Sequence, residues 1–156
     1  MLSRQDDGNH LGIENWLTSG GINKIDALFH MAWSGVPLSA EEDPDKSERD
    51  DLPLLKLLLS NLATVQNRPL LVFFSTAAVY GNTYKIFGSK ERDTPAPLGC
   101  YARNKLAGER LIEEFSYRTE IPATILRISN LYGFHPSQYS QPQGVINRLV
   151  NAAING

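Results

Sequence analysis

Three short, nearly continuous apolar runs alternate with helical patterns along this chain. The runs cover residues 25–33, 70–75 and 123–129. Apolar runs of this length, bounded by turn residues, are typical of strands that are buried on both faces. Strands that alternate with helices pair in parallel through right-handed crossovers. The order therefore predicts an α/β fold with a parallel sheet built from three βα units.

The predicted helices follow from apolar residues at helical spacing. Leucines recur in this way over residues 52–65, where Pro53 suits the first turn of a helix. Residues 101–118 carry an apolar stripe opposite charged residues, and about 144–155 form the last helical pattern. Residues 36–51 are polar and acidic, and we expect them to form a loop.

Composition excludes several classes of protein. The chain has 156 residues, the length of one domain or a part of one. A net charge of −2 and the lack of a basic stripe argue against a nucleic-acid partner. The single cysteine, Cys100, suits a reducing cytoplasm, and no apolar run approaches a membrane span. We therefore expect a cytoplasmic protein without a membrane partner. The three histidines lack the spacing of metal ligands, so no metal site is predicted.

A tyrosine and a lysine stand four residues apart where the helix 101–118 begins. At this spacing Tyr101 and Lys105 project from the same helix face, and the lysine charge would lower the tyrosine pKa from its usual value of ~10. Thr76, at the end of a predicted strand, can hold a substrate oxygen while Tyr101 moves a proton there. Hydride transfer at the adjacent carbon needs a cofactor, because no side chain carries hydride. The Tyr-Lys pair by itself is a weak sign, since such a pair also occurs at an ordinary solvated helix start.

Longer segments strengthen this interpretation. The segments FFSTAAVYG (73–81), CYARNKLAGERLIEEF (100–115) and ATILRISNLYG (123–133) resemble the extended short-chain dehydrogenase/reductase family. Within that family they are most similar to the NAD-dependent nucleotide-sugar epimerase/dehydratase group. The segment LFHMAWSGVP (28–37) matches that group's strand ending in His-x-Ala. The resemblance extends from about Ile25 to the C-terminus and is specific for the family, not for a substrate.

The resemblance implies roles for individual residues. Tyr101 would be the acid/base, Lys105 would lower its pKa and hold ribose hydroxyls, and Thr76 would hold the sugar hydroxyl, with its neighbour Ser75 as second choice. The implied catalytic residues are therefore Tyr101, Lys105 and Thr76. The implied cofactor-binding residues are Met31, Ala32, Trp33, Asp51, Tyr101, Lys105 and Ser129. The implied substrate-binding residues are Thr76, Tyr101 and Asn130.

Some of these residues also have an ordinary structural interpretation. The segment Met31–Trp33 is equally well explained as strand core and turn, and Asn130 as a turn residue. Asp51 stands where relatives usually carry an asparagine, so its place in an active-site network is in doubt, and an aspartate there could instead cap a helix.

The sequence contains no G-x-G-x-x-G or G-x-x-G-x-x-G turn, which would bind the pyrophosphate of a dinucleotide. The resemblance therefore implies that residues 1–156 are a partial NAD-binding domain, with a partial doubly wound parallel sheet (Rossmann-like). Its first βαβ unit and a C-terminal substrate domain would be absent. We expect weak NAD binding, or none, by this chain alone.

The implied activity is that of an NAD-dependent nucleotide-sugar epimerase, with NADP the less favoured cofactor. A 4-epimerase acting on UDP-glucose and UDP-galactose is the favoured form. Dehydratases usually carry acidic residues after the Ser/Thr position, whereas Ala77 and Ala78 follow Thr76 here. A related dehydratase or reductase stays open. The resemblance also allows a homodimer through helices 52–65 and 101–118. The alternative is a non-catalytic remnant that keeps the scaffold without binding cofactor.

Overall fold

In the computed structural model, the three apolar runs form one parallel sheet. The structure describes residues 21–34, 43, 46–82, 88–129, 131, 149–150 and 152–154. Its elements are η1 (Gly21–Lys24), β1 (Ala27–His30), α3 (Lys46–Leu62), β2 (Leu70–Thr76), η2 (Ala77–Tyr80), α4 (Cys100–Thr119) and β3 (Ala123–Ile128). No helix within this part of the chain is both long and apolar enough to cross a membrane.

The strands lie in the order β1-β2-β3, and both pairs are parallel. Phe29 of β1 lies beside Val72 of β2, and Phe74 of β2 lies beside Leu126 of β3. The parallel, Rossmann-like α/β fold predicted from the sequence is therefore confirmed. The predicted strand 25–33 is shorter in the structure, because β1 pairs with β2 only over Ala27–His30 before the chain leaves the sheet.

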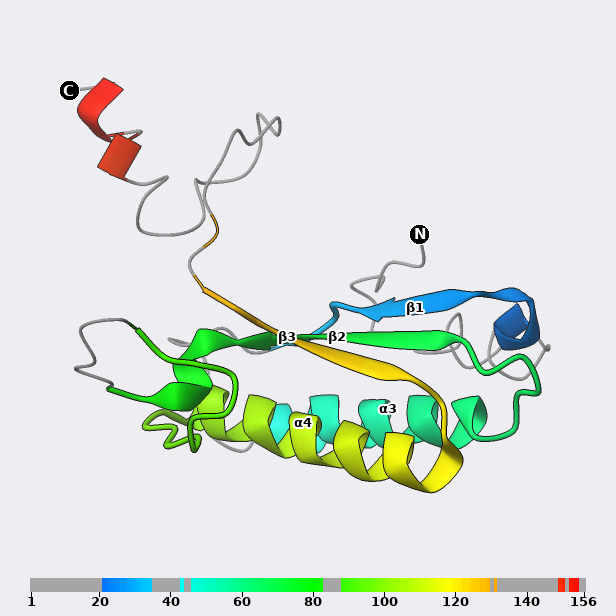
Figure 1. Cartoon of the computed structure of the whole chain (residues 1–156). Helices are drawn as coiled ribbons and strands as arrows, with labels where there is room; N and C mark the ends of the chain where they lie inside the picture. Colours follow the sequence, from blue (N-terminus) through cyan, green and yellow to red (C-terminus); the bar gives the residue numbers. More distant parts are fainter. Residues whose placement is uncertain are drawn as a thin grey trace.

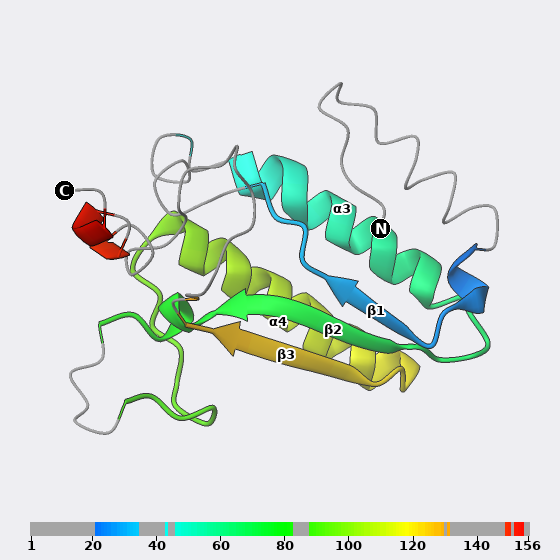
Figure 2. The same ribbon diagram turned by 90° about the horizontal axis from the view of Figure 1, so that it is seen from above.

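Both long helices cover the same face of the sheet. Figure 1 shows α3 and α4 side by side beneath the three strands, and the view from above agrees (Figure 2). The core forms between these layers, where Leu71 and Phe73 of β2 are fully buried. Both helices contribute side chains to this core: Leu55, Leu58, Leu59 and Leu62 from α3, and Ile112 and Phe115 from α4. Burial of this apolar area is the main force that fixes the helices on the sheet.

The opposite face of the sheet is also apolar. Alternate strand residues point to opposite faces, and Phe29 and Leu126 remain 61% and 39% exposed. The prediction that the first run, 25–33, is buried on both faces is therefore wrong for the described residues. The physical reason is that no described helix covers this second face.

Helix α3 begins earlier than predicted. Residues 46–51 belong to α3, so the predicted loop 36–51 is wrong in this part, and Pro53 lies inside the helix rather than in its first turn. A proline at this position cannot donate to the carbonyl of Arg49, which normally costs helix stability. Tertiary contacts of the helix offset this cost, because Asp51 and Leu55 are buried against neighbouring elements.

The other helix predictions fare better. Helix α4 spans Cys100–Thr119 and so confirms the predicted helix 101–118. The described residues 149–150 and 152–154 have helical backbone, while the rest of the predicted helix 144–155 lies outside the described residues. The short helix η2 was not predicted.

Candidate active site

The predicted catalytic residues lie toward one edge of the sheet. Thr76 ends β2, and α4, which carries Tyr101 and Lys105, begins on the side where β2 and β3 end (Figure 2). The carboxyl edge of a parallel sheet is where ligands bind in open α/β folds. Residues about 25 positions apart in the sequence thus belong to one region of the surface.

Thr76 stands between β2 and η2. Its side-chain oxygen accepts a hydrogen bond from the backbone N–H of Ala78 at 3.2 Å and so caps η2. A threonine hydroxyl that accepts a bond still has its proton to donate. Thr76 therefore remains able to bind a substrate oxygen.

Lys105 is almost completely buried, with 3% of its surface exposed. Its Nζ donates to the carbonyl oxygen of Phe74 at 2.7 Å and lies 4.2 Å from the centre of the Trp33 ring. Burial lowers the pKa of Lys105 to about 8, although the charges of Asp51 and Glu109 act in the opposite direction. At neutral pH this lysine still carries its positive charge.

Tyr101 lies half-buried in the first turn of α4. Burial, followed by the negative charge of Asp51, raises its pKa above the usual value of 10.0. The expectation that Lys105 lowers this pKa is not met in the structure. The lysine ammonium instead binds the carbonyl of Phe74 and the Trp33 ring.

Asp51 ties α3 to the segment that follows β1. Its carboxylate accepts two hydrogen bonds from Ser34, one from the backbone N–H at 2.8 Å and one from the hydroxyl at 2.9 Å. Asp51 does not cap α3, which begins five residues earlier at Lys46. The buried carboxylate instead supplies the negative charge that acts on both Tyr101 and Lys105.

The segment after β1 presents the other predicted cofactor-binding residues. Met31 and Ala32 are exposed, whereas Trp33 is partly buried over Lys105. Two buried nitrogens here, Nδ1 of His30 and Nε1 of Trp33, have no hydrogen-bond partner among the described residues. Burial, together with the charge of Lys105, lowers the pKa of His30 to about 4, so this histidine is neutral at pH 7. Unpartnered polar atoms of this kind are what a bound ligand or water satisfies.

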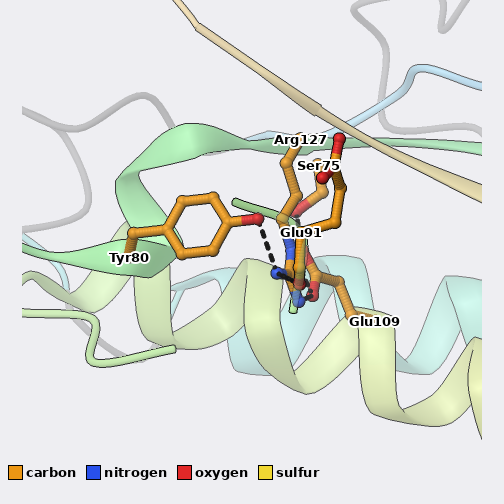
Figure 3. A network of polar contacts seen from close by, with 5 residues as sticks. All are labelled: Ser75, Tyr80, Glu91, Glu109 and Arg127. Carbon is orange, nitrogen blue, oxygen red and sulfur yellow. Dashed lines mark hydrogen bonds and ion pairs between the residues drawn. The ribbon is translucent and has the colours of Figure 1, made fainter. Parts of the chain in front are cut away.

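A buried polar network next to this site escaped the sequence analysis (Figure 3). Glu109 of α4 forms an ion pair with Arg127 of β3 at 2.7 Å and accepts a hydrogen bond from the Ser75 hydroxyl. The guanidinium of Arg127 also donates to the Tyr80 hydroxyl at 2.9 Å and to the backbone carbonyl of Glu91 at 3.3 Å. The signal in the sequence was a single arginine inside the apolar run 123–129.

A pocket lies elsewhere along the same edge. It has a volume of about 820 Å³ and is bordered by Arg127, Tyr80 and Ser129, among others. Of the predicted site residues that the structure describes, only Ser129 lines it, and neither Tyr101 nor Lys105 does. We place the candidate active site at Thr76 and Tyr101 because the proton-transferring groups are there. Asn130 lies outside the described residues.

Comparison with known proteins bears directly on this geometry. The model of the NAD-dependent epimerase/dehydratase family matches residues 7–156. UDP-glucuronate 4-epimerase 4 of Arabidopsis thaliana is 25% identical over 130 residues, which are 76% of this chain and 30% of that protein. The dTDP-D-glucose 4,6-dehydratase of Dictyostelium discoideum is 28% identical over 145 residues, 85% of this chain and 32% of that protein. The chain thus spans about a third of the length of these relatives.

A solved structure has a similar backbone. The UDP-glucuronic acid 4-epimerase of Bacillus cereus, in complex with UDP-4-deoxy-4-fluoro-glucuronic acid and NAD, superimposes with a TM-score of 0.75. The match covers 99% of this chain and 45% of that chain, at 24% sequence identity. At this identity the likeness shows the fold.

Proposed function

Because the chain belongs to the NAD-dependent epimerase/dehydratase family, we propose that it is part of an enzyme that epimerises a nucleotide sugar. A 4-epimerase of a UDP-hexose, such as UDP-glucose and UDP-galactose, is the favoured activity. The observation that carries this proposal is the placement of Thr76 and of the helix turn with Tyr101 and Lys105 at one carboxyl edge. In this proposal residues 1–156 are a partial NAD-binding domain.

NAD fits the site in part. The exposed Met31 and Ala32, the unpartnered Trp33 nitrogen and the Lys105 ammonium are groups that would hold the nicotinamide and its ribose. Asp51 and Ser129 would border the same half of the cofactor. The sequence lacks a glycine-rich turn for the pyrophosphate, so these residues fit only part of the dinucleotide. When bound, NAD supplies the acceptor and donor of hydride that no side chain can supply.

The residues of the chain would handle the proton. Thr76 would donate a hydrogen bond to the oxygen on the reacting sugar carbon, and Asn130 would bind the substrate nearby. Tyr101 would remove the proton of this hydroxyl when the carbon is oxidised and return it when the ketone is reduced. To act as a base, Tyr101 needs a lower pKa than it has in this structure. The positive charge of an oxidised nicotinamide beside the phenol would lower it.

The sequence after Thr76 bears on the choice among the family's activities. Ala77 and Ala78 follow Thr76, so the acidic residues expected of a dehydratase at this point are absent from the sequence. Among the relatives, the Arabidopsis protein is named a 4-epimerase and the Dictyostelium protein a dehydratase. The sequence thus favours epimerisation, which needs only the proton and hydride steps.

A non-catalytic remnant is the second candidate. The raised pKa of Tyr101 and the burial of Lys105 favour the remnant. A raised pKa opposes the deprotonated form that a base needs, and burial hinders Lys105 from reaching a cofactor. The absent glycine turn favours the remnant as well. In this case the chain would keep the scaffold without binding the cofactor.

We also propose a homodimer through the outer surfaces of α3 and α4. A groove of about 420 Å³ runs between the two helices and is lined by Leu59, Leu111 and Phe115, among others. These apolar side chains, which lie among polar ones such as Lys56 and Glu114, would be covered by the same helices of a second copy. Light scattering of the purified chain tests this, with Leu111→Glu as the variant expected to be monomeric.

The experiment for the main proposal measures NAD binding by the purified, folded chain, with calorimetry as the readout. UDP-glucose and UDP-glucuronate would then be assayed for conversion to their 4-epimers, with Tyr101→Phe as the control. Binding with epimerisation that is lost in Tyr101→Phe supports the enzyme. Because weak NAD binding, or none, is expected of residues 1–156 alone, a folded chain that binds no NAD would be a fragment whose chemistry exists only in the full-length protein. Absence of NAD binding and epimerisation in the full-length protein as well would support the remnant.

A further inference from the structure

The sheet-facing side of α4 carries an unusual polar stripe. Tyr101, Lys105 and Glu109 are spaced four residues apart, so they lie on one face of the helix. Lys105 and Glu109 are both buried in the described structure, with Glu109 only 1% exposed. A stripe of this kind buries two charges where apolar residues would pack at lower cost. Stability alone therefore does not explain why this face of α4 is polar.

This stripe binds consecutive residues at the end of β2. Lys105 donates to the carbonyl oxygen of Phe74, and Glu109 accepts from the hydroxyl of Ser75. The next residue of the strand is Thr76, and the next residue of the stripe toward the helix start is Tyr101. Two polar contacts, one helical turn apart, thus fix the position of α4 along β2 and its rotation about the helix axis.

The ion pair with Arg127 fixes this arrangement from a third element. Ser75 of β2 and Arg127 of β3 are directly paired in the sheet, so Glu109 meets both from below (Figure 3). Both carboxylate oxygens of Glu109 accept from Arg127, at 2.7 to 3.1 Å. A two-point contact of this kind defines an orientation as well as a distance.

The same arginine also holds the turn that follows Thr76. Its guanidinium donates to the Tyr80 hydroxyl and lies 4.8 Å from the centre of the Tyr80 ring. Tyr80 ends η2, and the backbone N–H of Ala78 in η2 donates to the Thr76 hydroxyl. One partly buried guanidinium is therefore connected both to the helix of Tyr101 and to the turn of Thr76.

We propose that Glu109 and Arg127, together with Ser75 and Tyr80, are positioning residues that set the approach of Tyr101 to Thr76. This inference rests on the proposed function, because it assigns the network a purpose at that same site. The network touches neither the substrate oxygen nor the reacting carbon. It acts through the placement of α4 and η2.

The test uses mild variants that remove one contact each and leave every charge in place. Ser75→Ala removes the bond between β2 and Glu109, and Tyr80→Phe removes one donor contact of Arg127. Ser116→Ala is the matched control, because it also removes one serine hydrogen bond of α4, to the carbonyl of Ile121 at 2.7 Å, far from the site. All three variants are expected to fold.

The first readout is the pKa of Tyr101. It is measured by NMR titration of the wild type and the variants, with labelled tyrosine rings. Tyr101→Phe identifies its signal among the six tyrosines. Looser docking of α4 exposes Tyr101 to water, so Ser75→Ala and Tyr80→Phe should lower this pKa by roughly half a unit or more. Ser116→Ala should leave the pKa of Tyr101 unchanged. It should lower the melting temperature about as much as Ser75→Ala does, because each variant loses one serine hydrogen bond of α4.

The second readout is turnover. In the active enzyme the two network variants should lower kcat about tenfold with little change in KM, because misplacement of reacting groups costs rate more than binding. If Ser75→Ala and Tyr80→Phe behave like Ser116→Ala in the tyrosine titration, the network only stabilises the fold and the inference is wrong. Since the titration needs no turnover, a failure of the proposed function would be seen separately.

Discussion

Gly81 offers the sharpest test of how the turn beside Thr76 is built. Its backbone has φ +66° and ψ −150°, a conformation that is essentially open only to glycine. A Cβ atom at this position would lie 2.1 Å from the carbonyl oxygen of Ala96. Gly81→Ala thus combines an unfavourable backbone conformation with a collision against another backbone segment, which cannot rotate away as a side chain can.

The expected cost follows from these two contributions. The backbone conformation costs an alanine on the order of 1–3 kcal/mol. Relief of the collision moves the Ala96 segment, whose N–H donates to the carbonyl of Val79 at 2.9 Å, and loss of that bond costs about 1 kcal/mol more. We expect Gly81→Ala to lower the free energy of unfolding by about 3 kcal/mol, or roughly 10 °C in melting temperature.

Gly88 provides the matched control. It also has positive φ, +71°, but a Cβ atom there would meet no atom of the described residues within 4 Å. Gly88→Ala should therefore cost only the conformational part, about 1 kcal/mol. Urea unfolding of both variants measures the difference. Equal losses for the two variants would refute the reasoning, because the contact with Ala96 would then contribute nothing.

Three further predictions concern buried charges. His30 has a folded-state pKa of about 4 against 6.5 when unfolded, so the unfolded chain binds more protons between these values and acid favours unfolding. Lowering the pH from 7.5 to 5 should cost the wild type about 2 kcal/mol more than His30→Gln in urea unfolding, and parallel curves would contradict this. Asp51→Asn removes a negative charge that raises the pKa of Tyr101, so NMR titration should find this pKa lower than in the wild type. An unchanged pKa would mean that burial alone raises it. Arg127→Leu leaves Glu109 as a buried, unpaired charge and should destabilise the fold by about 3–5 kcal/mol. Adding Glu109→Gln in the same chain should recover part of this loss. If the double variant recovers none of it, the ion pair is not the cause.

Much of the fold follows from short-range patterns. The apolar runs that became β2 and β3, and the amphipathic stretch that became α4, are each defined by neighbours a few residues away. The candidate residues Thr76, Tyr101 and Lys105 were also identified from their positions at the ends of these elements. A strand end and a helix start are properties of the local sequence, and parallel strands bring their carboxyl ends to one edge.

The start of α3 shows where local patterns fail. Pro53 and the acidic residues before it suggested a loop followed by a helix start. The helix begins at Lys46 instead, and Asp51 turns inward to bind Ser34, which is 17 residues away. A contact over that distance is not visible in any window of the sequence.

The electrostatics of the site were decided by the tertiary structure alone. The sequence places Lys105 one helical turn from Tyr101, but the fold directs its ammonium to Phe74 and Trp33. It also brings the carboxylate of Asp51 close enough to raise the pKa of Tyr101. Burial and charge depend on which segments pack together, so the residue types at the site could be read from the sequence, whereas their protonation could not.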